Sequence, residues 1–163
     1  KYKKNKKVRV YDNAIANICG EVDFYETTLN GSGSILPLGT LHEVSYGSEE
    51  AETFKVNSTT LDTFYKNEII DILWIDVQGA EKMVLEGGLK ILQKVKAIFI
   101  EISIYPELYK KSTTFKEIDE ILKNYGFNLV LLGTDINLTG NALFIKHNNN
   151  LCDWLFLKLS KEI

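Results

Sequence analysis

The chain has 163 residues, of which 45% are hydrophobic and 25% are charged, and its formal net charge is −3. This is the balance of an ordinary globular domain, and the length suffices for one domain with its own core. The mild negative charge argues against nucleic acid as a partner, and no apolar run reaches the roughly 18 residues that a membrane-spanning helix needs. We therefore expect a single domain over residues 1–163.

Cysteine and histidine usage limits the function further. Cys19 and Cys152 lie far apart and form no CxxC pair, which is typical of a reduced setting rather than a disulfide framework. The chain does not begin with the basic-then-apolar order of a signal peptide, so we expect a cytoplasmic location. His42 and His147 have no other Cys or His at ligand spacing, so we expect no metal site and place both histidines in loops or on the surface.

The first part of the chain shows strand-like and loop-like patterns. Three segments alternate between apolar and polar residues and predict strands, namely residues 8–11, 21–26 and 52–57. The first two could be antiparallel neighbours joined by residues 13–20. Residues 27–50 lose all periodicity and are rich in Gly and Ser, which indicates a lid, a binding loop or a disordered segment. Ser58 or Thr59 is expected to cap the short helix that follows.

The second part of the chain alternates between strands and helices. The apolar run over residues 71–77 predicts a strand that is buried on both faces. The later elements are a helix over 79–93 that Gly87-Gly88 weakens, a strand over 95–103, a helix from Thr113 or Thr114 to Gly126, strands over 127–132 and 142–146, and a helix over 151–159. Strand–helix–strand units force parallel pairing. We therefore expect an α/β fold with a mostly parallel sheet that ends in an antiparallel hairpin.

Two carboxylates at the strand ends are the main candidate functional groups. Asp76 and Glu101 end consecutive parallel strands, so they share the sheet edge at which open α/β sheets bind ligands. On neighbouring strands, about 5 Å apart, both could face one ligand. They could hold a divalent metal, act as acid or base, or accept hydrogen bonds from a ligand. Alternatively each could cap a helix or pair with a lysine, and Glu81 in a first helical turn favours the capping role.

A second polar strand exit lies near the start of the chain. Asp12, Asn13 and Ala14 combine polar side chains with a small residue, which suits the close approach of a flat ring, or is a plain exit into a turn. The Gly and Ser residues at 31–34 could form a phosphate loop. A dinucleotide fingerprint needs a third glycine and a helix, and Leu36-Pro37 follows instead, so that motif is excluded.

Several segments of the chain also match the signature of a known family. They are Thr60-Leu61-Asp62-Thr63-Phe64, the run Ile70 to Glu81 (IDILWIDVQGAE), Val84-Leu85-Glu86-Gly87-Gly88, Asn13-Ala14-Ile15, Gly33-Ser34, Ile100-Glu101-Ile102 and Asn141-Ala142-Leu143-Phe144. In this order they resemble the FkbM-type methyltransferases. The chain departs from that pattern at Gln78, where the family usually has Glu.

The resemblance implies a Rossmann-like class I methyltransferase fold, S-adenosylmethionine as cofactor, and O-methylation of a hydroxyl on a sugar or natural product. It places Asp12, Asn13 and Ala14 near the adenine. It places Asp76 beside the transferring methyl group, as a cofactor-binding and catalytic residue, and gives Glu101 a second catalytic role. It also sets residue 1 just before the family's third strand. We therefore expect an N-terminally truncated domain that lacks the first strands and the glycine-rich cofactor loop.

Two other functions compete with methyl transfer. A degenerate domain could have kept the fold and serve only as a binding module for a partner or a glycan. A metal-dependent hydrolase could use Asp76 and Glu101 as ligands. As partners we expect a small-molecule or glycan acceptor, neither nucleic acid nor membrane, and possible association into a homo-oligomer.

Overall fold

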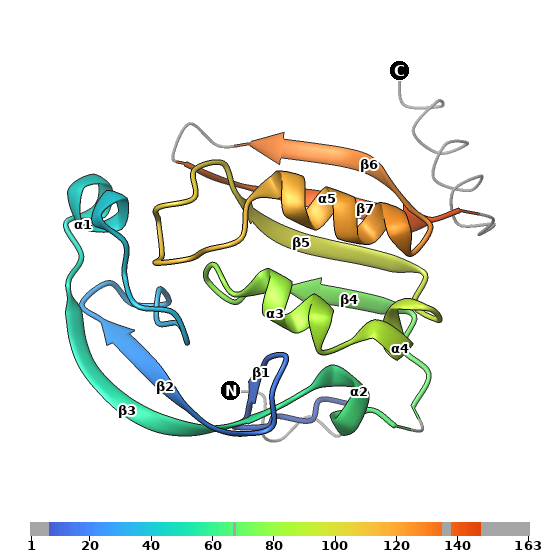
Figure 1. Cartoon of the computed structure of the whole chain (residues 1–163), viewed down its shortest axis with the longest axis horizontal. Helices are drawn as coiled ribbons and strands as arrows, with labels where there is room; N and C mark the ends of the chain where they lie inside the picture. The colour runs from blue at the N-terminus through green and yellow to red at the C-terminus, as the bar shows by residue number, and fades with distance from the viewer. Residues whose placement is uncertain (1–6, 67, 135–137, 148–163) are drawn as a thin grey trace.

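The computed structural model describes residues 7–66, 68–134 and 138–147. The elements follow in the order β1 (Ala14–Ile15), β2 (Gly20–Thr27), α1 (Thr40–Tyr46), β3 (Glu50–Thr59), α2 (Leu61–Phe64), β4 (Ile72–Ile75), α3 (Glu81–Glu86), α4 (Leu89–Leu92), β5 (Ala97–Ser103), α5 (Phe115–Asn124), β6 (Phe127–Thr134) and β7 (Thr139–Lys146) (Figure 1). The helix expected over residues 151–159 lies outside the described residues. None of the described helices is long and apolar enough to cross a membrane.

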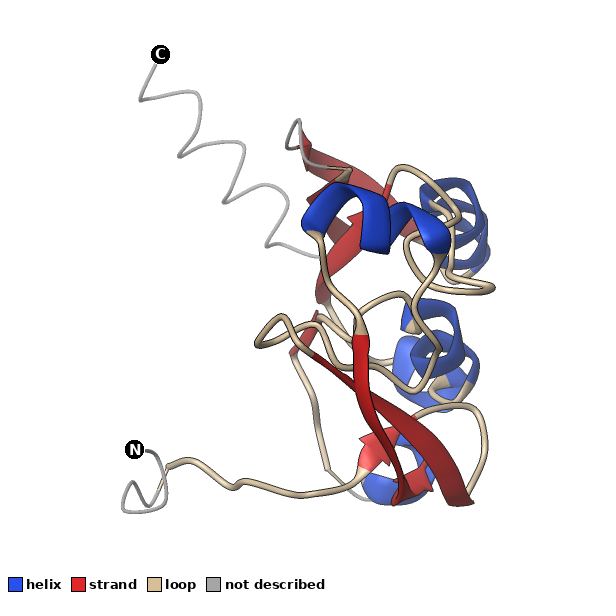
Figure 2. Ribbon diagram, turned by 90° about the vertical axis from the view of Figure 1, so that its left-hand side faces the viewer, coloured by secondary structure: helices blue, strands red, loops and turns tan. Residues whose placement is uncertain are grey.

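A four-stranded sheet carries the hydrophobic core. Its strand order is β4-β5-β7-β6, with β4 and β5 parallel and the other two pairs antiparallel. Figures 1 and 2 show α3, α4 and α5 on one face of this sheet. The residues of β5 that point to these helices alternate along the strand and are fully buried or nearly so, namely Ile98, Ile100 and Ile102. The expected hairpin of the last two strands is confirmed.

Helix α5 follows its sequence signals closely. The Thr114 side chain accepts a hydrogen bond from the Glu117 backbone N–H, and the Glu117 carboxylate accepts one from the Thr114 N–H. This reciprocal pair satisfies two N–H groups that would otherwise lack an intrahelical partner. Ile118 and Leu122 lie one turn apart and are buried against the sheet, so the expected start of this helix at Thr113 or Thr114 is confirmed.

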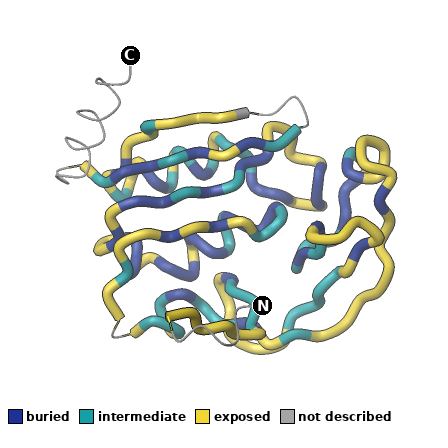
Figure 3. The backbone as a smooth tube through the Cα atoms, turned by 180° about the vertical axis from the view of Figure 1, so that it is seen from behind, coloured by how far each residue is buried: buried dark blue, intermediate teal, exposed yellow. Residues whose placement is uncertain are grey.

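The opposite face of the same sheet is open in the described structure. Ile72 and Trp74 on β4 are 61% and 74% exposed, and the Trp74 ring packs on Phe99 of β5 with ring centroids 4.4 Å apart. Figure 3 views this side and shows exposed residues along β4. The prediction of a strand buried on both faces is therefore wrong for β4. The physical reason is that the described helices cover only one face.

A separate three-stranded sheet has the order β1-β3-β2. Strand β1 pairs in parallel with β3, and β2 pairs antiparallel with β3 over its whole length. Residues 8–11 form no strand, so the expected pairing of 8–11 with 21–26 is wrong, and β3 takes the place of that partner. Antiparallel pairs outnumber parallel ones among the described strands, by three to two, so the expectation of a mostly parallel sheet is not met.

Two helix boundaries differ from the sequence prediction. The helix expected over 79–93 is split into α3 and α4 at Gly87-Gly88, where Gly87 lies against the Ala16 carbonyl oxygen with no room for a side chain. The Asp62 carboxylate accepts hydrogen bonds from the Lys90 and Ile91 backbone N–H groups and so starts α4 afresh. Helix α2 is capped by Thr60, which directly follows the expected candidates Ser58 and Thr59.

Candidate active site

The structure brings Asp76 and Glu101 to the same edge of the four-stranded sheet. Asp76 directly follows β4, and Glu101 on β5 directly follows Ile100, the register partner of Ile75. The Gln78 amide nitrogen donates hydrogen bonds to Asp76 Oδ1 at 2.7 Å and to Glu101 Oε2 at 3.1 Å. The two carboxylates are thus held as a pair by one amide, as their strand positions led us to expect, and their catalytic role stays a prediction.

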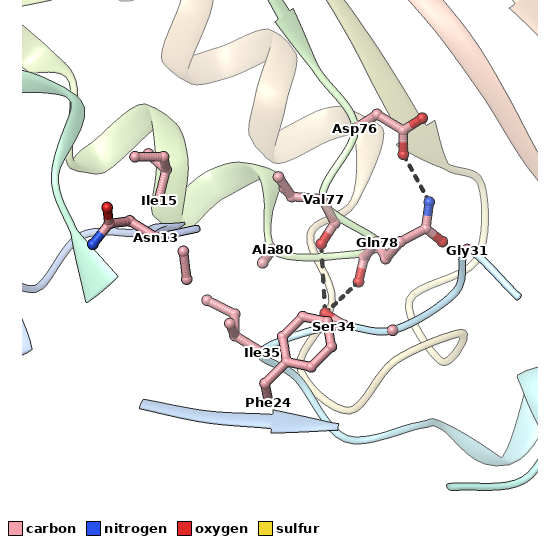
Figure 4. A pocket seen from close by; sticks show the side chains of 12 residues that line it. Asn13, Ile15, Phe24, Gly31, Ser34, Ile35, Asp76, Val77, Gln78 and Ala80 are labelled. Atoms are coloured by element: carbon pink, nitrogen blue, oxygen red, sulfur yellow. Dashed lines mark hydrogen bonds between the residues drawn. The ribbon is translucent and has the colours of Figure 1, made fainter. Parts of the chain in front are cut away.

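An unusual backbone conformation and two hydrogen bonds fix the position of Gln78. Its backbone has φ 54°, in the left-handed region that residues other than glycine rarely adopt. The Tyr109 hydroxyl lies 2.9 Å from the Gln78 side-chain oxygen and donates to it. The Ser34 hydroxyl donates to the Gln78 backbone oxygen at 2.8 Å (Figure 4). Because the amide oxygen faces Tyr109, the amide nitrogen faces the carboxylates.

Sequence reasoning gave Gln78 no role and did not single out Tyr109. The departure from the family's Glu was a signal that position 78 matters, but it did not show what the amide does. Tyr109 follows Pro106 in a segment without periodicity, and it reaches Ser32 over 77 positions of the sequence. No local pattern records a contact of that range.

Burial and mutual repulsion perturb the Glu101 carboxylate. Removal from water raises its pKa first, and the neighbouring charge of Asp76 adds to the effect, so that the pKa rises from 4.5 to about 8. The hydrogen bond from Gln78 acts in the opposite direction and stabilises the charged form. A carboxyl group with a pKa near neutrality at a ligand-binding edge is suited to proton transfer.

Glu81 serves the local backbone. Its side chain is only 2% exposed and accepts hydrogen bonds from the backbone N–H groups of Gly79 at 3.1 Å and Val77 at 3.4 Å. Burial raises its pKa, and these backbone bonds oppose that rise. The carboxylate holds the turn between β4 and α3, which agrees with the expected role at a helix start.

A pocket of about 390 Å³ lies beside the carboxylate pair. It is lined by Asn13, Ala14, Ile15, Phe24, Gly31, Gly33, Ser34, Ile35, Asp76, Val77, Gln78 and Ala80, which come from both sheets and the loop after β2 (Figure 4). Three of the four residues expected to bind the cofactor, Asn13, Ala14 and Asp76, are among them. Asp12 is exposed and does not line the pocket. The apolar side chains, together with the amides of Asn13 and Gln78, suit a flat heteroaromatic ring such as adenine.

The segment over residues 27–50 is ordered into the wall of this pocket and into helix α1. The backbone groups of Tyr25 and Ser34 exchange two hydrogen bonds of 2.8 and 3.1 Å, which fold the loop back on β2. His42 of α1 is buried, with its ring nitrogen 3.4 Å from the Tyr109 hydroxyl, and burial lowers its pKa. The expectation of a loop or surface position is therefore wrong for His42, whereas His147 is exposed.

The site has no ready set of metal ligands. Within the described residues, no three His, Cys, Asp or Glu side chains are grouped so that they could hold a metal ion. Gln78 stands between the two acids and points its amide nitrogen at them. An amide N–H is a hydrogen-bond donor, and a hard cation such as Mg²⁺ requires oxygen ligands instead.

Comparison with known proteins identifies the family. Residues 3–129 match the model of the methyltransferase FkbM domain. The 2-O-methyltransferase NoeI of Sinorhizobium fredii (strain NBRC 101917 / NGR234) is 31% identical over 130 residues, which cover 73% of this chain and 53% of that protein. This chain thus spans about half the length of the curated relative that it matches. No solved structure matches it. The resemblance in the sequence motifs is thereby confirmed, and the chain belongs to the FkbM methyltransferase domain family.

Proposed function

We propose that this domain transfers a methyl group from S-adenosylmethionine to a hydroxyl group of a sugar or other natural product. The observation that carries the proposal is the Asp76–Glu101 pair, which one amide holds at the ligand edge of the sheet beside a pocket fit for adenine. Membership of the FkbM family supports methyl transfer, and the name of the relative NoeI, a 2-O-methyltransferase, supports a hydroxyl as the acceptor.

The residues of the pocket fit one end of the cofactor. Ala14 and Ile15 at the end of β1 would lie against the adenine ring, and the Asn13 amide can both donate to and accept from its polar edge. Phe24 and Ile35 would close the other side and exclude water. When bound, S-adenosylmethionine supplies an electrophilic methyl group. The protein's own task is then to align the acceptor oxygen and take its proton.

The two acids divide this task. Asp76 lines the pocket, so its carboxylate can accept a hydrogen bond from the acceptor hydroxyl and fix its direction. Glu101 has the pKa of about 8, which makes its charged form the stronger base. We therefore assign orientation to Asp76, which lines the pocket, and proton removal to Glu101, which the Gln78 amide holds beside it. This refines the sequence prediction, which placed both roles first on Asp76. Activity should rise with pH as Glu101 loses its proton near pH 8.

The test uses the full-length protein, because the chain spans only about half of its relative. Binding of S-adenosylhomocysteine is measured by calorimetry, and transfer of a labelled methyl group is measured on a panel of sugars. Asp76→Asn should lower transfer by about 100-fold or more, the scale of lost acid–base and orientation chemistry. The matched control is Asp71→Asn, at the other end of the same strand, whose partner is the exposed Lys96.

The proposal is contradicted if the protein binds no S-adenosylhomocysteine, which would favour the binding-module alternative. It is equally contradicted if Asp76→Asn and Asp71→Asn behave alike. The hydrolase alternative is less well supported, because the Gln78 amide nitrogen occupies the position between the acids that a shared cation would need.

A further inference from the structure

A second hollow, of about 450 Å³, adjoins the pocket beside Asp76. It is lined by Phe24, Glu26, Thr27, Thr28, Leu29, Asn30, Gly31 and Gly33. It shares Phe24, Gly31 and Gly33 with the first pocket, so the two spaces meet at one aromatic ring and one turn of backbone. The two hollows are therefore neighbours, which suits a cofactor in the first and an acceptor in the second.

The turn that forms this hollow is held by its own hydrogen bonds. The Thr27 and Ser32 hydroxyls both donate to the Leu29 carbonyl, at 2.8 and 2.7 Å. Gly33 lies so close to Phe24 that an added Cβ would stand 2.9 Å from the ring, so a larger residue at this position would require the ring to move. The hollow is preformed, which lowers the entropic cost of binding a ligand in it.

Tyr109 connects this turn to the residues that hold the carboxylate pair. The Tyr109 hydroxyl lies 2.9 Å from the Ser32 carbonyl oxygen and 2.9 Å from the Gln78 side-chain oxygen. Tyr109 is buried, so it forms a fixed link between the turn and the amide that holds Asp76 and Glu101. The distance from the hollow to the acids is therefore set by the fold and does not depend on a mobile loop.

Two polar side chains of this hollow, Glu26 and Asn30, are available to a ligand. Within the described part of the chain, neither side chain has a hydrogen-bond or ion-pair partner. Glu26 also stands directly opposite Glu52 on β3, and like charges in that position destabilise a strand pair. Together with Asn30 and the Phe24 ring, Glu26 offers a carboxylate, an amide and an apolar face to one ligand.

We infer that this hollow is the subsite for the hydroxyl-rich body of the acceptor, a carbohydrate whose reacting hydroxyl points to Asp76. The inference rests on the proposed function and names the residues that select the acceptor. Glu26 accepts hydrogen bonds from sugar hydroxyls, Asn30 both donates and accepts, and Phe24 covers the apolar face of the ring. These are specificity residues, since none of them touches the acid pair.

The test is a nuclear magnetic resonance titration of the full-length protein with methyl glycosides of neutral hexoses, in the presence of S-adenosylhomocysteine. The backbone N–H groups of Gly31 and Gly33 and the side-chain amide of Asn30 report on the hollow directly. We expect at least one glycoside to shift these signals, and Glu26→Gln to weaken its binding by about tenfold.

Glu52→Gln is the matched control, because either substitution removes the same like-charge contact and only Glu26 lines the hollow. It should leave sugar binding within about twofold of the wild type. The inference is overturned if no glycoside shifts the three reporters, or if both variants weaken binding equally. Calorimetry with S-adenosylhomocysteine on the same samples separates the two proposals. Cofactor binding without sugar binding refutes the subsite alone, and sugar binding without cofactor binding refutes methyl transfer alone.

Discussion

The two sheets of this domain are stabilised in different ways. The β4-β5-β7-β6 sheet packs one face against α3, α4 and α5, and side chains such as Ile98, Ile100 and Phe144 are completely buried there. The β1-β3-β2 sheet has no such core among the residues that the structure describes, and most residues of β3 are exposed. It is held mainly by its backbone ladder and by exposed pairs such as Asp23 and Lys55.

The candidate active site lies where the two sheets meet. The acids come from the well-packed sheet, which can hold reacting groups in a fixed geometry. The wall of the second hollow comes from the β2 strand and the loop after it, in the less packed part, whereas the first pocket is also lined by β1 and by the turn after β4. The difference implies that catalytic geometry and acceptor choice are carried by separate parts of the fold, and that the second can change with little loss of stability.

The largest expected effect is on the free energy of unfolding, and it tests whether the two sheets differ in packing. Leu85→Ala removes a side chain that is 0% exposed and lies in the main core, so it should lower the free energy of unfolding by about 2–5 kcal/mol. Phe54→Ala on β3 removes a ring that is 40% exposed and packs on Phe24, and should cost only about 1 kcal/mol. Denaturant unfolding of both variants measures the contrast.

Equal losses in these two variants would contradict the comparison, since the three-stranded sheet would then contribute to stability as a core does. Val44→Ala is the control for a side chain without packing, because Val44 on α1 is almost fully exposed. Its unfolding curve should coincide with that of the wild type.

The sequence predicted the well-packed sheet better than the other one, and the reason is physical. The start of α5 is encoded within four residues by Thr114 and Glu117, and the β5 strand is encoded by a continuous apolar run. Such signals are local, so they can be read without knowing the fold. By contrast, Ile72 and Trp74 make β4 equally apolar although nothing described covers them. Hydrophobicity alone does not say which faces are covered.

The sequence predicted the two acids of the site but not the hydrogen bonds that connect them to the rest of the fold. The positions of Asp76 and Glu101 follow from strand order, because parallel neighbours end at the same edge. The hydrogen bonds from Gln78 to both acids depend on a left-handed backbone at a residue that rarely adopts one. The link through Tyr109 depends on a contact between distant segments, which only the folded chain defines.

A smaller effect should appear in the pH dependence of stability. Glu101 has a pKa of about 8 in the folded protein, above its ordinary value of 4.5, so the folded state binds the proton more tightly. The stability that this proton contributes is complete below pH 4.5 and is lost as the pH rises to about 8. Glu101→Gln removes this loss, and should raise the free energy of unfolding at pH 9 by about 1 kcal/mol after solvent screening is discounted.

The measurement is thermal unfolding of both proteins between pH 5 and pH 9. At pH 5 the two should agree, because the wild-type carboxyl is then protonated and resembles the amide of the variant. Glu107→Gln is the control, since it makes the same chemical change at an exposed side chain away from the acid pair. A gain for Glu101→Gln that is the same at every pH would show that the effect comes from packing and not from the charge.

The smallest expected effect concerns the ion pair that crosses the three-stranded sheet. Lys55 Nζ lies 2.7 Å from Asp23 Oδ1, and the pKa of Lys55 is raised by this partner, yet both side chains are largely exposed. Water and salt screen such a pair, so Lys55→Gln should shift the midpoint of thermal unfolding by no more than about 1 °C at physiological salt. A shift as large as that of Leu85→Ala would mean that charge pairs replace a core in this sheet. A negligible shift means that the backbone ladder and ring contacts such as Phe24–Phe54 keep β2 and β3 together, which leaves the charged side chains on this sheet free to serve ligand binding.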